Sequence, residues 1–303
     1  MKDKSQAEKT AAERQVELLS TALGSAPSAN GYWLNASGKT YPSFYPKGLT
    51  VSPFNALIMS LHSDKSGSKT NLFMLFSEAK RQGVAVREHE RGVPFLFYNW
   101  NQYVNRNNPK DIISRNDYQA LDVEQQKQYK GVHNREIRTL FCIDQTTMPF
   151  ANEKEYKKLL ADYGTAEERG QGEGDDRAMH VSFNDFLLKM RDNLVPIRTD
   201  GSGVAHYDTE KDAVYMPRQK DFEHYNDYVQ ETLRQIVSAT GHQQRLAREG
   251  MVMKNGTAPS EDAIKKERLV AELASGVKML ELGLPARLSE EGLHLTDYWV
   301  REL

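Results

Sequence analysis

The chain has 303 residues, with 40 Lys and Arg against 42 Asp and Glu and a formal net charge of −2. This length allows two modest domains or one large one, and a mean hydropathy of −0.68 is typical of a soluble globular protein. No apolar run approaches the roughly 20 residues that cross a bilayer, and the first residues lack the apolar core of a signal peptide. We therefore expect a cytoplasmic protein without a membrane partner.

The single cysteine, Cys142, excludes an internal disulfide and a cysteine-based zinc cluster. It lies within the apolar run 139–143, which is typical of a buried strand. We expect an inert core thiol and not a nucleophile.

The first element expected is a helix over residues 5–23, which has Ala12, Val16, Leu19 and Leu23 on one face and is ended by Gly24. Its polar face is long, so we interpret residues 1–24 as an N-terminal helical arm that is either mobile or packed only lightly. Residues 25–45 follow as a loop-rich segment that contains several aromatic side chains.

A short helix is expected to end at Gly83, and residues 84–98 indicate two strands joined by a turn at 88–92. The very polar stretch 101–137 predicts an excursion from the domain, partly helical near 116–128. Residues 39–110 hold about ten Lys and Arg against about four acids, and such a basic segment favours a polyanionic partner.

Glycine and acidic residues dominate 163–179, as expected for an interdomain linker. We thus predict an α+β protein of two domains, 25–162 and 180–303. In the second domain, residues 203–207 and 213–216 predict a hairpin, and residues 259–283 predict a helix.

The stretch 225–246 predicts an amphipathic helix, because apolar residues from Tyr225 to Val237 recur at helical spacing and Gly241 can end the helix. Taken alone, this pattern indicates only a core helix. Three neighbouring motifs suggest more: Ser238-Ala-Thr-Gly-His-Gln-Gln-Arg-Leu, the preceding Asp212-Ala-Val-Tyr-Met-Pro, and the following Glu267-Arg-Leu-Val-Ala-Glu.

Together these motifs resemble the C-terminal zincin-like domain of the ArdC antirestriction family. In that family the helix reads His-Glu-x-x-His-x-Thr-Gly-His. Aligned through Thr-Gly-His242, the first His falls on Arg234, the Glu on Gln235 and the second His on Ser238. All three are replaced.

These replacements matter because two His at i and i+4 hold Zn²⁺ and the adjacent Glu activates its water. Arg stays protonated, Ser is a poor zinc ligand and Gln cannot act as a base. We expect a retained fold with no catalytic residue, no metal and no cofactor. We further hypothesise that Arg234 occupies the cation position and pairs with Glu267 or Glu272, while His242 is structural.

A second resemblance covers residues 76–92, where Phe76, Ala79, Gly83, Arg87 and Gly92 match the N-terminal single-stranded-DNA-binding domain of the same family. The turn is less basic than the family pattern, because Glu88 and His89 replace a Lys and a Gly. DNA binding needs cations for the phosphates and aromatic faces for the bases. The candidates are Lys80, Arg81, Arg87, Arg91, Trp33, Tyr41, Tyr45 and Trp100; alternatively, the cations are solvated and the aromatics fill a core.

The resemblance implies a protein of a mobile or conjugative element, such as a conjugative transposon, that binds incoming single-stranded DNA and shields it from restriction. The replaced ligands indicate that this protein is non-catalytic. One alternative is an active metal-dependent hydrolase with displaced ligands, in which His206 and His224 join His242. Another is a scaffold that binds only a host or element-encoded protein.

Overall fold

The computed structural model describes residues 2–34, 39–46, 49–169, 176–199, 201, 203–253 and 256–303. Helices and strands alternate irregularly along the chain, so the expected α+β class is confirmed. Residues 170–175 of the predicted linker 163–179 lie outside the described residues, whereas residues 176–179 are not linker but the first turn of helix α8 (Asp176–Asn193). Among the described helices, none is both long enough and apolar enough to span a bilayer.

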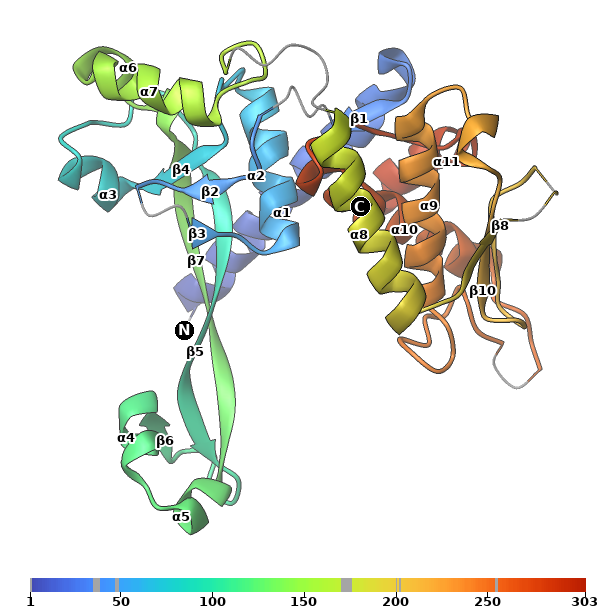
Figure 1. Ribbon diagram of the computed structural model, residues 1–303. Helices are drawn as coiled ribbons and strands as arrows, with labels where there is room; N and C mark the ends of the chain where they lie inside the picture. The colour runs from blue at the N-terminus through green and yellow to red at the C-terminus, as the bar shows by residue number, and fades with distance from the viewer. Residues whose placement is uncertain are drawn as a thin grey trace.

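The N-terminal part is built around a six-stranded sheet in the order β3-β2-β4-β7-β5-β6. Only the β2–β4 pair is parallel. Figure 1 shows α2 beside this sheet, with α3, α6 and α7 gathered at one end. The elements in chain order are α1 (Lys2–Ser25), β1 (Tyr32–Leu34), β2 (Ser43–Phe44), β3 (Leu49–Thr50), α2 (Pro53–Lys65), β4 (Leu72–Leu75), α3 (Phe76–Arg81), β5 (Val93–Asn105), β6 (Ile112–Ser114), α4 (Arg115–Ala120), α5 (Val123–Lys127), β7 (Tyr129–Cys142), α6 (Met148–Ala151) and α7 (Glu153–Tyr163).

Strands β5 and β7 form a long antiparallel ribbon, paired from Val93 and Leu140 out to Asn105 and Tyr129. The ribbon projects away from the rest of the molecule and carries β6, α4 and α5 at its tip (Figure 1). Stacking of Tyr103 on Tyr118, with ring centroids 3.8 Å apart, closes the tip. The excursion expected over 101–137 is thus the outer half of a ribbon, and its helical portion is two short helices.

Residues 84–92 do not form the expected first strand of a hairpin. Val86 makes a single antiparallel bridge with Thr146, and strand β5 begins only at Val93. The chain turns here with His89 in the left-handed region at φ 64°. Gly92 then lies so close to β7 that an added Cβ would be 2.4 Å from the Leu140 carbonyl oxygen, which explains the need for glycine.

The C-terminal part pairs a three-stranded sheet, in the order β8-β10-β9, with a group of helices. The predicted hairpin is present, because β9 and β10 are antiparallel, while β8 is parallel to β10. The elements are α8 (Asp176–Asn193), β8 (Ile197–Thr199), β9 (His206–Asp208), β10 (Ala213–Met216), α9 (Tyr225–Thr240), α10 (Glu261–Glu281), β11 (Ala286–Arg287) and α11 (Glu290–Glu302).

Helix α1 forms where the sequence predicts it, but it is not a separate arm. Leu18, Leu19 and Leu23 are buried in a core that also contains residues of α2 and α10, and α1 contacts α11 as well. Strand β1, which falls in the predicted first domain 25–162, pairs with β11 near the C-terminus. The reason is apolar burial: the leucine face of α1 needs both parts of the chain to cover it. Cys142 is fully buried, and burial raises the pKa of its thiol, which keeps it protonated.

Trp33 on β1 packs against α10 at Gly276, where an added Cβ would lie 2.2 Å from the indole ring. We expect Gly276→Ala to lower the free energy of unfolding by about 1–3 kcal/mol through overpacking, although alanine favours helix by about 1 kcal/mol. Urea unfolding measures the change. Adding Trp33→Phe to the Gly276→Ala variant should recover part of the loss; a purely additive double variant would contradict the contact.

Candidate functional site

The residues at the aligned His-Glu-x-x-His positions, Arg234, Gln235 and Ser238, lie on α9, which packs against α10. Amphipathic spacing buries one side of α9, and Leu233 and Ile236 of that side enter the apolar core. Gln235 and Ser238 are also buried there, together with Glu267 and Glu272 of α10. Their burial means that every charge in this layer requires a partner.

Arg234 is enclosed by two carboxylates. Its Nε donates to Glu272 Oε2 at 2.9 Å, and its Nη1 donates to Glu231 Oε2 at 2.9 Å. Its Nη2 donates to the Arg287 carbonyl of β11 at 2.5 Å. Burial alone would lower the pKa of Arg234, but Glu272 and Glu231 raise it above its usual value. The guanidinium therefore stays charged, and the hypothesised pairing is found with Glu272.

Glu272 also fixes the next helix. Its Oε1 accepts hydrogen bonds from the Ser289 backbone N–H and hydroxyl, at 2.9 and 2.6 Å, and Ser289 caps the N-terminus of α11. The side chain of Glu272 is 3% exposed and that of Arg234 is 12% exposed. One ion pair thus connects α9, α10, β11 and α11.

Glu267 has a different partner, which sequence reasoning missed. Arg248, in the loop after α9, donates from Nε and Nη2 to the two Glu267 oxygens at 2.7 Å each. It also donates to the Val237 carbonyl and the Thr240 hydroxyl, so it caps the last turn of α9. A basic residue in an aperiodic loop carries no pattern that would have indicated this role.

Gln235 and Ser238 line a cavity of about 290 Å³, together with Glu267 and with His206 and Tyr207 of β9. Gln235 donates to Glu231 Oε1 at 2.7 Å. Over the described residues, no three His, Cys, Asp or Glu side chains lie close enough to share a metal ion. Polar side chains thus form part of the cavity wall. The carboxylate among the lining residues, that of Glu267, is already bound to the Arg248 guanidinium.

The three histidines considered as displaced ligands lie in separate environments. His242 accepts a hydrogen bond from the Gln244 backbone at the end of α9. His206 stacks on Tyr215 with ring centroids 5.1 Å apart. His224 precedes α9 and lies 3.9 Å from Glu223. This arrangement does not bring the three imidazoles together.

The four basic candidates for DNA contact are exposed around α3 and the following turn. Arg81 pairs with Glu78, and Arg87 pairs with Glu90. Lys80 and Arg91 make no hydrogen bond or ion pair from their side chains within the described part of the chain. The latter two are the cations most available to a ligand.

The aromatic candidates whose side chains are described are less exposed than the basic ones. Trp33 is 4% exposed and packed against α10, so the expectation that it stacks on a base is wrong. Tyr41 and Tyr45 are half-buried against apolar clusters, and burial raises the pKa of both. The Trp100 side chain lies outside the described residues. Sequence reasoning missed Phe76 and Phe150, whose side chains are 56% and 76% exposed on α3 and α6.

Comparison with known proteins agrees with this architecture. The family model "Zincin-like metallopeptidase" matches residues 188–303, and the family model "N-terminal domain of anti-restriction factor ArdC" matches residues 12–141. A search of curated proteins gave no match. The protein is thus of a class that joins an ArdC N-terminal domain to a zincin-like domain.

Solved structures show the same fold over nearly the whole chain. The metal-free crystal structure of the antirestriction protein ArdC from the R388 plasmid is 17% identical with a TM-score of 0.55. Its Mn(II)-bound structure is 17% identical with a TM-score of 0.58. Both comparisons cover 95% of this chain and 88% of the other. The chain belongs to the ArdC-like antirestriction family.

Arg234→Ala should lower the free energy of unfolding by about 3–5 kcal/mol, because it leaves Glu272 and Glu231 without their buried counter-charge. Thermal or urea unfolding measures the loss. Arg218→Ala is the matched control, since Arg218 forms an exposed pair with Asp221 and its removal should change little. Equal effects from the two variants would refute a structural role for the Arg234 ion pairs.

Proposed function

We propose that this protein is a nucleic-acid-binding, antirestriction-type protein that no longer uses its zincin-like domain for metal-dependent hydrolysis. In this proposal it acts in the cytoplasm on behalf of a plasmid or other conjugative element and binds single-stranded DNA. The observation that carries the proposal is the pair of arginines, Arg234 and Arg248, bound to the two buried carboxylates of α10.

The residues of the site do not suit a divalent cation. Glu267 and Glu272 would have to leave their guanidinium partners before either could bind a metal, and two fixed positive charges would remain beside it. The positions that align with the histidine ligands hold Arg234 and Ser238, and the position of the general base holds Gln235. Gln235 has no proton-accepting carboxylate with which to activate water.

Support for DNA binding comes from the N-terminal domain. Its family model is that of the ArdC N-terminal domain, and Lys80, Arg81, Arg87 and Arg91 present exposed positive charge along α3 and the next turn. Phe76 and Phe150 add exposed rings on α3 and α6, and base stacking on such rings contributes about 1–3 kcal/mol per base.

We expect the protein purified without chelators to contain no stoichiometric zinc or manganese, because its two carboxylates already bind arginines. Elemental analysis tests this. The combined variant Arg234→His, Gln235→Glu, Ser238→His restores two imidazoles at i and i+4, and added zinc should then raise its Tm. Arg234→His alone is the control and should not respond. Stoichiometric metal in the natural protein that disappears in His242→Ala would favour a hydrolase with displaced ligands.

Single-stranded oligonucleotides should bind with an affinity that falls as salt rises, because cations displace counterions from the phosphates. Fluorescence anisotropy across a salt series measures the slope of log K against log salt. Lys80→Ala should reduce the magnitude of that slope by about 0.7. Lys220→Ala, which removes an exposed lysine a few residues after β10, should leave the slope unchanged. If added protein does not raise the anisotropy of the oligonucleotide at low salt, the DNA-binding proposal is wrong. The alternative of a scaffold that binds only other proteins would then remain.

A further inference from the structure

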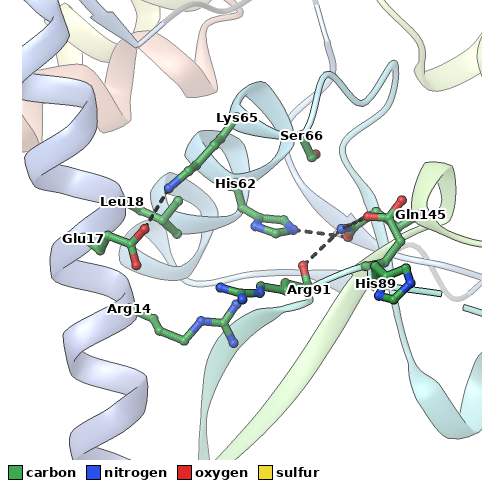
Figure 2. Close-up of a pocket in the computed structure, with 10 residues that line it drawn as sticks. Arg14, Glu17, Leu18, His62, Lys65, Ser66, His89, Arg91 and Gln145 are labelled. Carbon is green, nitrogen blue, oxygen red and sulfur yellow. Dashed lines mark hydrogen bonds and ion pairs between the residues drawn. The ribbon is translucent and has the colours of Figure 1, made fainter. Parts of the chain in front are cut away.

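A second cavity, of about 260 Å³, lies between α1, α2 and the turn at 89–91, in the N-terminal part of the molecule. Arg14 of α1, Lys65 of α2 and Arg91 of the turn line it, with His62 and Gln145 behind them. Figure 2 shows the Arg14 and Arg91 side chains reaching into this space toward each other. Two guanidinium groups that face each other repel, and an anion between them would remove the repulsion.

Two acids, Glu17 and Glu90, also line the cavity, but each forms its ion pair with a cation other than Arg14 and Arg91. Glu17 pairs with Lys65 at 2.9 Å, and Glu90 pairs with Arg87 at 2.6 Å. Arg14 donates instead to the Gly92 carbonyl at 2.5 Å, which holds it in place without cancelling its charge. Arg91 makes no hydrogen bond or ion pair through its side chain with any described residue. The cavity therefore carries an excess of fixed positive charge.

The back wall of the cavity is a saturated hydrogen-bond network around Gln145, which is 3% exposed. The Gln145 amide oxygen accepts from the Cys142 backbone at 3.0 Å and is 3.2 Å from His62 Nε2. Its amide nitrogen donates to Glu90 and to the Arg91 carbonyl, at 3.0 and 3.1 Å. This network fixes the backbone of the turn, and so pre-organises the position from which the Arg91 side chain extends.

His89 supplies an independent observation. It lines the cavity, yet its backbone lies in the left-handed region at φ 64°, where glycine is favoured and other residues cost about 1 kcal/mol or more. Its side chain is exposed at the cavity mouth. Strain of this kind clusters at ligand sites, and an imidazole N–H here can donate to an oxyanion.

We propose that this cavity binds a phosphate monoester, held between Arg14 and Arg91 with His89 at the mouth. A phosphate dianion matches the paired guanidinium groups, which donate bidentate hydrogen bonds to phosphate oxygens. The volume is below the roughly 300–1,000 Å³ of typical ligand pockets, so it admits a phosphate with its first sugar and not a run of nucleotides. This inference rests on the proposed DNA binding where the phosphate is the 5′ end of a DNA strand, and is independent of it where the phosphate belongs to a free molecule.

The test is a binding comparison on the full chain at fixed salt. The probes are one labelled single-stranded oligonucleotide with a 5′-phosphate, a 3′-phosphate or two hydroxyl ends, together with unlabelled deoxynucleoside 5′-monophosphate and inorganic phosphate as competitors. The 5′-phosphorylated strand should bind about tenfold more tightly than the hydroxyl form, the effect of one charge-assisted contact. The monophosphate should reduce the affinity of the 5′-phosphorylated strand to that of the hydroxyl form, and should not affect binding of the hydroxyl form.

The Arg91→Ala variant should abolish the preference for the 5′-phosphate, because this exposed side chain contributes charge and not packing. Lys80→Ala is the matched control: it removes an exposed, unpaired cation outside the cavity, so it should weaken all strands equally and keep the preference. His89→Gly should retain folding, since glycine suits φ 64°, and should reduce the preference in part.

Different results separate the two proposals. Equal binding of all three strands without competition by the monophosphate would overturn the phosphate site and leave DNA binding intact. Binding of the monophosphate by calorimetry, lost in Arg91→Ala, with no binding of any strand, would support the site for a free phosphorylated molecule and overturn the DNA proposal. A preference that survives Arg91→Ala would also overturn the site.

Discussion

The ion pair between Arg234 and Glu272 is the constraint on which the C-terminal half depends. It is almost fully buried, and through its other hydrogen bonds it reaches the Arg287 carbonyl of β11 and the Ser289 cap of α11. A buried charge pair of this kind adds little over apolar packing while both partners are present, but leaves a large penalty when one is missing. The ion pair therefore adds little net stability, but it determines how α9, α10, β11 and α11 pack together.

A guanidinium and a bound dication compensate a buried carboxylate in different ways. A metal ion can dissociate, and its affinity depends on the protonation of its ligands. Arg234 and Arg248 are covalently part of the chain and remain charged at any ordinary pH. Glu267 and Glu272 of α10 are thus compensated by charges that belong to the chain itself.

Arginine side chains in the N-terminal part of the molecule are in a different electrostatic environment from those on and after α9. Arg234 and Arg248 each face a carboxylate that satisfies their charge. Arg14 and Arg91 face each other across a cavity, and the nearby acids are bound to other cations. Compensated arginines hold a structure together, whereas uncompensated arginines in a fixed geometry are free to bind an anion. The proposed DNA contacts and the proposed phosphate site therefore both lie in the N-terminal part of the chain.

The α+β class, the course of α9, the hairpin before it and the residues Arg234, Gln235 and Ser238 at the aligned His-Glu-x-x-His positions could all be predicted from the sequence, because they follow from local periodicity and residue chemistry. The sequence also indicated that Arg234 would find a carboxylate on α10. The burial of Trp33 beside Gly276, the binding of Arg248 to Glu267 and the position of α1 in the core between both parts of the chain became known only from the folded structure. Those outcomes depend on contacts between segments far apart in the chain, where burial and charge pairing override local pattern, and no short stretch of sequence contains them.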